Sequence, residues 1–217
     1  MKEEKLLRKQ AYTQIKEIII NREPESHISL RKTAKKLGMS ITPVREAFQS
    51  LEKEGLIKSI PNIGYFIPNY SRSDIIEIFQ TRECLEMFVL EKTYNKLTDQ
   101  DIKNLEQYLK EQEKYHEEGE IFKHYEMDEK FHMIFFDLYG NDYLKKLIEK
   151  VREQYSIIII KSIKQHIMIK NNAKVIKEHY KILNAIKKGD KDTAMENMLT
   201  HITKAKQRAL NVIDGNI

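Results

Sequence analysis

The sequence predicts a mostly α-helical chain in two parts: an N-terminal winged helix-turn-helix and a C-terminal, all-α antiparallel helical bundle. Two observations predict this fold. Residues 29–67 have the pattern of a helix, a tight turn, a second helix and a β-hairpin. All four prolines precede residue 70, and the remainder has helical periodicity with only four glycines. We therefore expect domains at residues 1–70 and 71–217, each long enough to bury a core.

The first helix of the motif should begin after Ser29 and end at Gly38. The Ser29 side chain can cap a free N–H group of the first turn. Leu30, Ala34 and Leu37 recur at helical spacing, so they form one apolar face. Gly38 supplies the left-handed residue that commonly ends a helix.

The second helix should begin after Thr42, with Pro43 at its first position, where a missing N–H costs nothing, and should end at Gly55. Its inward face consists of Val44, Ala47, Phe48 and Leu51. Arg45 and Gln49 lie one turn apart on another face. Because arginine can pair with guanine and glutamine with adenine, this face is suited to a major groove. The alternative is a helix-turn-helix with a purely structural role.

A β-hairpin should follow, with strands at residues 56–60 and 65–67 and a turn at residues 61–64. Charge supports a role for this part in binding nucleic acid. Residues 1–70 contain 13 Lys/Arg and 8 Asp/Glu, whereas residues 71–217 contain 25 of each. The entire formal excess of +5 therefore lies in the N-terminal part, as expected for attraction to phosphate.

Composition also predicts the compartment. The single cysteine, Cys84, excludes an internal disulfide and suits a reducing cytosol. No apolar run approaches the roughly 18–20 residues that span a membrane. The charged N-terminus lacks the apolar core of a signal peptide. We therefore expect a cytoplasmic protein with no membrane partner.

The C-terminal part should form an antiparallel bundle of helices, because helical periodicity breaks mainly at glycines and capping residues. The expected helices are residues 73–95, 98–117, 120–139, 141–167, 172–188 and 190–212.

Four polar residues occupy positions of this bundle that should be apolar. His179 and His201 lie on inward faces of the last two helices, and Asp128 and His132 share a face of the third. An unpaired carboxylate is costly to bury, and a cation among these ligands removes that cost. The sequence thus predicts a divalent metal bound by Asp128, His132, His179 and His201, with zinc first and nickel, manganese, cobalt or iron as alternatives. The remaining histidines are expected at the surface: His27, His116, His124 and His166.

Two arginines also fall on inward faces. Arg82 lies one turn from Glu86, and Arg152 lies on the face of Ile148, Tyr155 and Ile159. Each arginine either pairs with a core glutamate or forms the cationic wall of a pocket for an effector carboxylate. Both are therefore candidate effector-binding residues.

Taken together, these motifs resemble GntR-type transcription regulators with a C-terminal FCD domain, of the FadR/VanR-like branch. The resemblance covers nearly the whole chain, and six helices after the wing suit the VanR-type subgroup. The N-terminal motifs are Ser29-Leu30-Arg31, Leu37-Gly38-Met39-Ser40, Thr42-Pro43-Val44-Arg45-Glu46-Ala47, Leu51-Glu52-Lys53-Glu54-Gly55-Leu56 and Pro61-Asn62-Ile63-Gly64. The C-terminal motifs are Arg82 with Leu85-Glu86, Asp128 with Phe131-His132, Glu178-His179 and His201-Ile202.

The resemblance implies a homodimer that binds a short palindromic operator in double-stranded DNA. It implies a metal held by the four ligands named above, and a small organic acid as effector beside it. The implied DNA-binding residues are Arg31, Ser40, Ile41, Thr42, Pro43, Arg45, Gln49, Asn62 and Gly64.

The chain departs from the family pattern at two positions that bear on DNA. Ile41 and Ile63 stand where the family usually has arginine, and Pro24-Glu25-Ser26 replaces its usual proline-glycine pair. Each bidentate arginine contact is worth roughly 1–3 kcal/mol of base discrimination. We therefore expect an operator richer in A·T, read partly by DNA shape.

Two other functions remain compatible with the sequence. Three histidines and an aspartate could hold a metal that activates water in an enzyme, although no separate general base or nucleophile has convincing spacing. The chain could also be a direct metal sensor without an organic effector.

Overall fold

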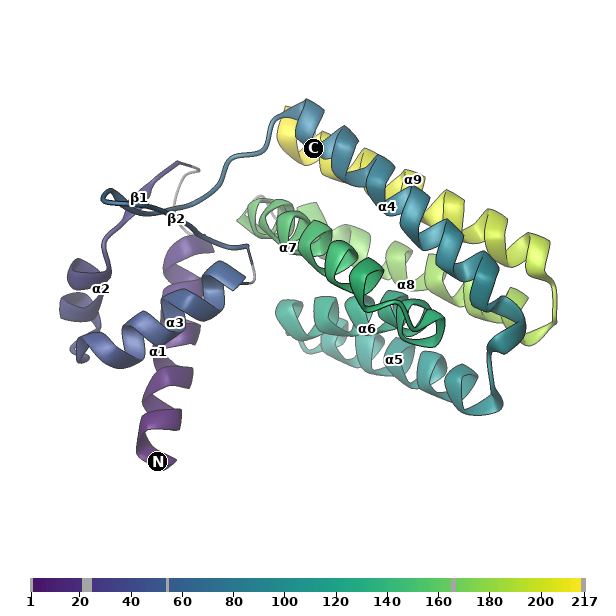
Figure 1. Cartoon of the computed structure of the whole chain (residues 1–217), viewed down its shortest axis with the longest axis horizontal. Coiled ribbons are helices and arrows are strands. Elements are labelled where there is room, and N and C mark those ends of the chain that lie inside the picture. Colours follow the sequence, from purple (N-terminus) through teal and green to yellow (C-terminus); the bar gives the residue numbers. More distant parts are fainter. Residues whose placement is uncertain (1, 21–24, 54, 165–166, 216–217) are drawn as a thin grey trace. The chain divides into compact units, whose positions relative to one another are not determined.

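The computed structural model describes residues 2–20, 25–53, 55–164 and 167–215. Contacts divide the chain into two compact units. The first consists of Met1–Ser71 with Arg152–Gln165, and the second of Arg72–Val151 with His166–Ile217. The described residues are mostly helical, with one small sheet, which confirms the predicted fold class (Figure 1).

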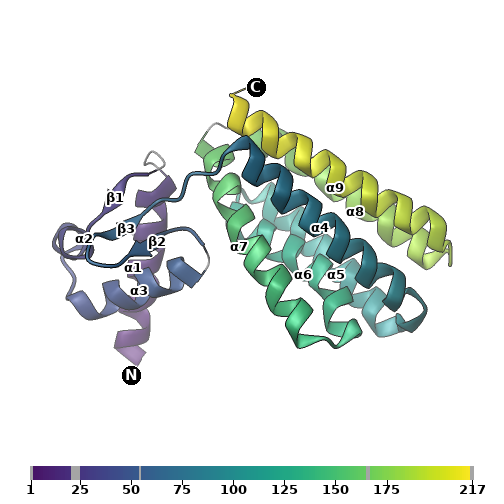
Figure 2. The ribbon, with the colours of Figure 1, turned by 45° about the horizontal axis from the view of Figure 1, so that its top comes forward.

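The first unit contains three helices and a three-stranded antiparallel sheet (Figure 2). The strands have the order β1-β3-β2, and β3 pairs with both neighbours through Tyr65 and Phe66. The elements are α1 (Lys2–Ile20), β1 (His27–Ile28), α2 (Leu30–Leu37), α3 (Ile41–Lys53), β2 (Lys58–Ile60) and β3 (Gly64–Phe66).

Helix α1 was not predicted, and it completes the core of this unit. Ala11, Ile15 and Ile19 are spaced four apart, so they lie on one helical face, and all three are buried. They pack in one cluster with Phe48 and Leu51 of α3. Helix α1 is therefore part of the folded domain, and the i, i+4 spacing of its apolar residues predicts such a helix.

The caps of α2 are as predicted. The Ser29 side chain accepts a hydrogen bond from the backbone N–H of Lys32, and Gly38 ends the helix with φ 63°. The predicted start of α3 was wrong by two residues, because the helix begins at Ile41. Pro43 is then its third residue, and it is tolerated because the first four N–H groups of a helix have no intrahelical acceptor.

The wing is the β2–β3 hairpin, and its tip is held by His27 of β1. The ring Nε2 of His27 lies 3.2 Å from the carbonyl oxygen of Ile63. Gly64 has φ 128°, and a Cβ there would stand 2.5 Å from the same nitrogen. Glycine is therefore required at this position by both backbone conformation and space.

The second unit is an antiparallel bundle, in which α4 packs beside α9, and α5 beside α6 and α8 (Figures 1 and 2). Five of the predicted helices match within three residues at each end. The exception is α8, which begins at Ile167 rather than residue 172. The elements are α4 (Arg72–Thr93), the short 3₁₀ helix η1 (Tyr94–Lys96), α5 (Asp99–Glu117), α6 (Ile121–Tyr139), α7 (Asp142–Lys164), α8 (Ile167–Lys187) and α9 (Lys191–Asp214). The part of α7 from Arg152 onward is grouped with the first unit.

Capping residues explain where these helices begin and end. Thr98 and Asp101 form a reciprocal capping box at the start of α5. Asp190 accepts a hydrogen bond from the Thr193 N–H at the start of α9, and Gly140 ends α6 with φ 73°. Among the described residues, no helix is both long and apolar enough to cross a membrane.

Candidate metal centre and DNA-binding surface

Three histidines from three helices meet inside the bundle. His132 of α6, His179 of α8 and His201 of α9 are each at most 2% exposed. The Nε2 of His179 lies 3.2 Å from that of His132 and 3.3 Å from that of His201. The structure therefore brings together the three imidazoles that the sequence placed on inward faces.

The opposite nitrogen of each ring faces an oxygen on a neighbouring side chain. Nδ1 of His179 lies 3.2 Å from Oε1 of Gln112, and Nδ1 of His201 lies 3.0 Å from a carboxylate oxygen of Glu178. Nδ1 of His132 lies 2.7 Å from a carboxylate oxygen of Glu86, an ion-pair distance without hydrogen-bond alignment.

These outer oxygens settle which nitrogen carries the proton. A carboxylate or an amide oxygen only accepts hydrogen bonds, so Nδ1 of His179 and of His201 is the protonated nitrogen. The Nε2 atoms of these two rings then carry a lone pair, and they lie on the side that faces the centre. Around a tetrahedral zinc with Zn–N bonds of about 2.0–2.1 Å, two nitrogens stand roughly 3.3 Å apart. The two spacings from His179 to His132 and His201 fit that geometry.

Burial keeps His179 and His201 uncharged when no cation is present. Burial lowers the pKa of His179 well below its usual range, and the neighbouring His201 lowers it further. Burial likewise lowers the pKa of His201 to about 4, although the Glu178 carboxylate opposes the shift. At neutral pH these two rings are therefore uncharged, which is the form that binds metals.

The predicted fourth ligand lies at one side of the histidine cluster. Asp128 of α6 is 7% exposed, and its Oδ1 lies 3.6 Å from Nε2 of His179. The three histidine nitrogens lie within 4.8 Å of one another, and Asp128 stands outside that set. Its carboxylate supplies the only formal negative charge among the four predicted ligands.

Arg82 of α4 is connected to the cluster through a glutamate. Its Nε donates a hydrogen bond to Oε1 of Glu86 at 2.8 Å, and both side chains are 2% exposed. The other oxygen of Glu86 faces His132. The guanidinium also lies over the Phe79 ring, 5.1 Å from its centroid. The predicted pairing of Arg82 with a core glutamate is confirmed.

Arg152 of α7 is also buried, at 7% exposure. Its contacts group it with the first unit, whereas the histidine cluster belongs to the second. The side chains of Tyr155 and Ile159, which were expected beside Arg152, lie outside the described residues. Its role in an effector pocket remains a prediction.

The structure also reveals polar residues that sequence reasoning missed. Gln112 of α5 is buried between His179 and His124. His124 was expected at the surface, but it is fully buried, with Nδ1 3.2 Å from the Gln112 carbonyl oxygen. Burial lowers its pKa, so this ring is also neutral. His27 is exposed and His116 half-buried, and His166 lies outside the described residues.

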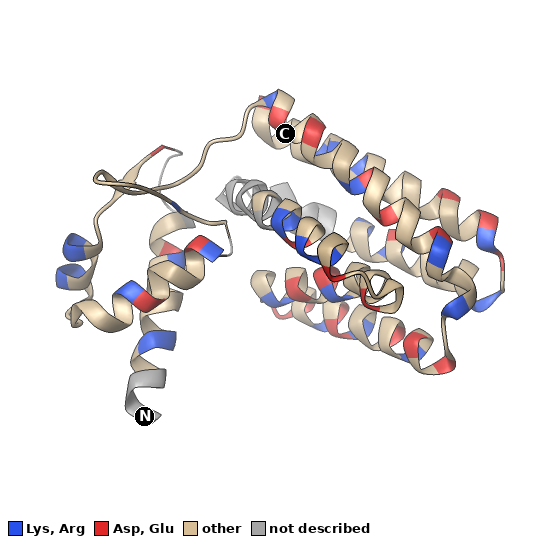
Figure 3. Ribbon diagram, in the orientation of Figure 1, with Lys and Arg blue, Asp and Glu red and all other residues tan. Residues whose placement is uncertain are grey.

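The predicted DNA-binding residues lie on the surface of the first unit. Those that are exposed are Arg31, Ser40, Ile41, Thr42, Arg45, Gln49 and Asn62. Pro43 and Gly64 are half-buried. Helix α2 carries four basic residues and no acidic one, whereas both signs are interspersed along the bundle helices (Figure 3).

Comparison with known proteins agrees with both units. Residues 7–67 match the gntR family of bacterial regulatory proteins, and residues 77–204 match the FCD domain. The HTH-type transcriptional regulator YdhC of Bacillus subtilis is 29% identical over 94% of this chain and 92% of its own length. The Nta operon transcriptional regulator of Aminobacter aminovorans is 26% identical over 89% of each chain.

Solved structures show the same fold. Escherichia coli McbR/YncC superposes with a TM-score of 0.69 at 21% identity, covering 91% of this chain and 94% of the other. A structure described as a metal-free FCD domain has a TM-score of 0.57 at 19% identity, covering 68% of this chain and 99% of the other. The family matches cover both the winged helix and the helical bundle. The chain therefore belongs to the GntR family of bacterial transcription regulators, with a C-terminal FCD domain.

Proposed function

We propose that this DNA-binding regulator is controlled by a small organic acid that binds beside a divalent metal in the FCD domain. The observation that carries the proposal is the convergence of three Nε2 atoms in a buried centre. Uncompensated, such a convergence is unfavourable, because no donor satisfies the buried acceptors. A cation bound by His132, His179 and His201, with Asp128 as the fourth ligand, removes the penalty.

Zinc is the first choice of metal, since three imidazoles and a carboxylate suit it, and nickel, manganese, cobalt or iron accept the same ligands. When bound, the metal supplies a Lewis-acidic centre for an anionic ligand. Gln112, Glu86 and Glu178 fix the orientation of the three rings, as outer partners of metal ligands commonly do.

The effector is proposed to be a small carboxylate, because a six-coordinate metal with four protein ligands has two positions left for oxygen. Arg82 supplies a buried guanidinium that pairs with Glu86, and Glu86 in turn faces His132 of the cluster. Arg152 is the second candidate for binding the carboxylate. Occupancy of this site is proposed to alter the affinity for DNA in a cytoplasmic homodimer.

The DNA-binding part is proposed to comprise residues 1–70, and the regulatory part residues 71–217. In this assignment α3 enters the major groove, with Arg45 and Gln49 reading base edges and Arg31 contacting the backbone. Asn62 and Gly64 place the wing against the flanking duplex. A homodimer would present two such surfaces to the halves of a palindrome.

Metal analysis combined with operator binding tests the proposal. Purified chain should contain about one metal per protomer, and His179→Ala should lose it. His116→Ala is the control, since His116 is only half-buried and outside the cluster. An organic acid should change operator affinity in the wild type and not in His179→Ala. A response to metal alone would instead indicate a direct metal sensor, and equal metal content in both variants would refute the ligand assignment.

A further inference from the structure

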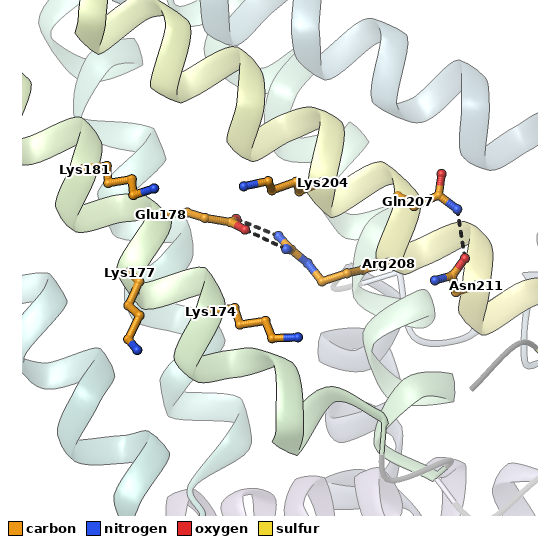
Figure 4. A pocket seen from close by; sticks show the side chains of 8 residues that line it. All are labelled: Lys174, Lys177, Glu178, Lys181, Lys204, Gln207, Arg208 and Asn211. Carbon is orange, nitrogen blue, oxygen red and sulfur yellow. Dashed lines mark hydrogen bonds and ion pairs between the residues drawn. The ribbon is translucent and has the colours of Figure 1, made fainter.

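A second polar site lies outside the histidine cluster, in a groove between α8 and α9 (Figure 4). Its volume is about 430 Å³. One carboxylate, that of Glu178, and five cationic side chains line it. The cations are Lys174, Lys177 and Lys181 of α8, with Lys204 and Arg208 of α9. The groove therefore has a strong excess of positive charge.

The floor of the groove is an ion pair that is already complete. Two nitrogens of Arg208 each donate to a different oxygen of Glu178, both at 2.9 Å. The side chains are 15% and 10% exposed. The same Glu178 carboxylate also accepts from His201. Its single negative charge is thus shared between two partners, and little of it is available to the lysines.

Among the described residues, the lysines that line the groove have no carboxylate partner of their own. Lys181 and Lys204 extend toward each other from the two helices, on one side of the Glu178–Arg208 pair (Figure 4). Lys174 extends from α8 toward the side of Arg208. In the part of the chain that the structure describes, none of these lysines pairs with a carboxylate. Like charges that converge in a recess raise the local potential and attract an anion.

We propose that this groove binds a small phosphorylated molecule. Lysine ammonium groups and an arginine fork are the donors that phosphate oxygens use in proteins. The volume is in the range of small-molecule sites. The cations line a recess from two sides, which suits a compact anion rather than the extended backbone of a duplex.

The groove is joined to the histidine cluster by one side chain. Glu178 contacts Arg208 on the groove side and Nδ1 of His201 on the inner side. A phosphate that draws Arg208 toward itself frees the carboxylate to move relative to His201. Where the proposed metal site holds, binding at the groove and at the metal would be coupled, and the coupling would be reciprocal.

Calorimetric titration of the metal-free full chain with pyrophosphate tests the site by itself. The chelator that is used to remove metal is itself a polyanion, so it is dialysed away before the titration. We expect saturable binding of one pyrophosphate per chain, weakened about fivefold by either Lys181→Gln or Lys204→Gln. Lys188→Gln is the matched control, because this exposed lysine follows α8 and does not line the groove. Absence of saturable binding, or equal weakening by the control, overturns the proposal.

Two further measurements separate the alternatives. The double variant Lys181→Gln/Lys204→Gln should bind random duplex DNA as the wild type does, and a loss would assign the groove to DNA instead. Citrate binding as tightly as pyrophosphate would refute the phosphate class. Pyrophosphate should also shift the ring nitrogen resonances of His201 in wild type and not in the double variant. Unchanged His201 resonances would refute the coupling between the groove and the histidine cluster. The phosphate site itself would still be tested by the calorimetric titration, which needs no metal.

Discussion

Gln112 Oε1 lies 3.2 Å from Nδ1 of His179, which fixes the Nε2 lone pair of that ring toward the two other histidines. The same glutamine also contacts His124. Its side-chain amide nitrogen lies 3.4 Å from Nε2 of His124, and its backbone carbonyl oxygen lies 3.2 Å from Nδ1. One buried amide from α5 thus orients a metal-ligand candidate on α8 and a structural histidine on α6.

Replacing Gln112 with leucine should therefore weaken metal binding without removing a ligand. Loss of an outer partner commonly costs about 10- to 100-fold in metal affinity, and we expect a value in this range. Competition with a metal-binding dye measures it. Gln107→Leu is the control, because Gln107 is on the same helix but bonds only to Glu111 at the surface. Equal affinity of Gln112→Leu and wild type would show that Gln112 does not orient His179.

Metal-free protein should lose stability as the pH falls below about 6.5. The pKa of His201 is lowered to about 4 in the folded chain, so the unfolded chain binds its proton first. Between pH 6.5 and 4 the free energy of unfolding should fall by about 1.4 kcal/mol per pH unit for this histidine. Glu178, which hydrogen bonds from His201 and Arg208 hold at a pKa of about 2 despite its burial, stays ionised throughout.

Urea unfolding at pH 7, 6 and 5 checks this dependence. His201→Gln lacks the titrating ring, so its stability should change less steeply over the same interval. Identical slopes for the variant and the wild type would mean that other groups cause the loss.

Arg45→Ala should abolish specific operator binding while the chain stays folded. Arg45 is exposed on α3, away from the buried face that holds the domain together. A bidentate contact to guanine is worth roughly 1–3 kcal/mol, or about 5- to 150-fold in affinity. Gel-shift titration measures the loss, and circular dichroism checks the fold. Arg72→Ala, in the second unit, serves as the control, and normal operator binding by Arg45→Ala would refute the docking of α3.

The operator should be rich in A·T, and one substitution should change that preference. Ile41 is 41% exposed at the start of α3, where it can contact a thymine methyl but cannot donate to guanine. Selection from random duplexes should return half-sites with more guanine for Ile41→Arg than for the wild type. Guanine-rich half-sites selected by the wild type itself would contradict the prediction.

Much of the histidine cluster could be predicted because helical spacing assigns a face. His132 lies on the same face as Asp128, and His179 and His201 interrupt apolar stripes. Gln112 could not be predicted in the same way. Its role depends on how α5 packs against α6 and α8, and this tertiary register leaves no mark on the spacing of residues within α5.

Other errors have equally specific causes. Thr42 followed by Pro43 has the pattern of a cap and a first helical residue, but α3 begins at Ile41, and Pro43 fits the first turn from either start. His124 was expected at the surface because it was not assigned to the inward-facing group of polar residues. Its principal partner is a backbone carbonyl, which every residue has, so the sequence carries no signal of that contact. The helix α1 was readable from Ala11 and Ile15, but it lies before the recognised motif.

At the wing tip, the backbone is held in place without the help of the Ile63 side chain. His27 holds the backbone of residue 63 through its carbonyl oxygen, while the Ile63 side chain itself is 60% exposed and packs little. Exchange of this side chain leaves the hairpin's support untouched, whereas any side chain at Gly64 collides with His27. Where the proposed contact between the wing and DNA holds, a single change at position 63 would alter operator preference without loss of the hairpin, and position 64 does not offer that route.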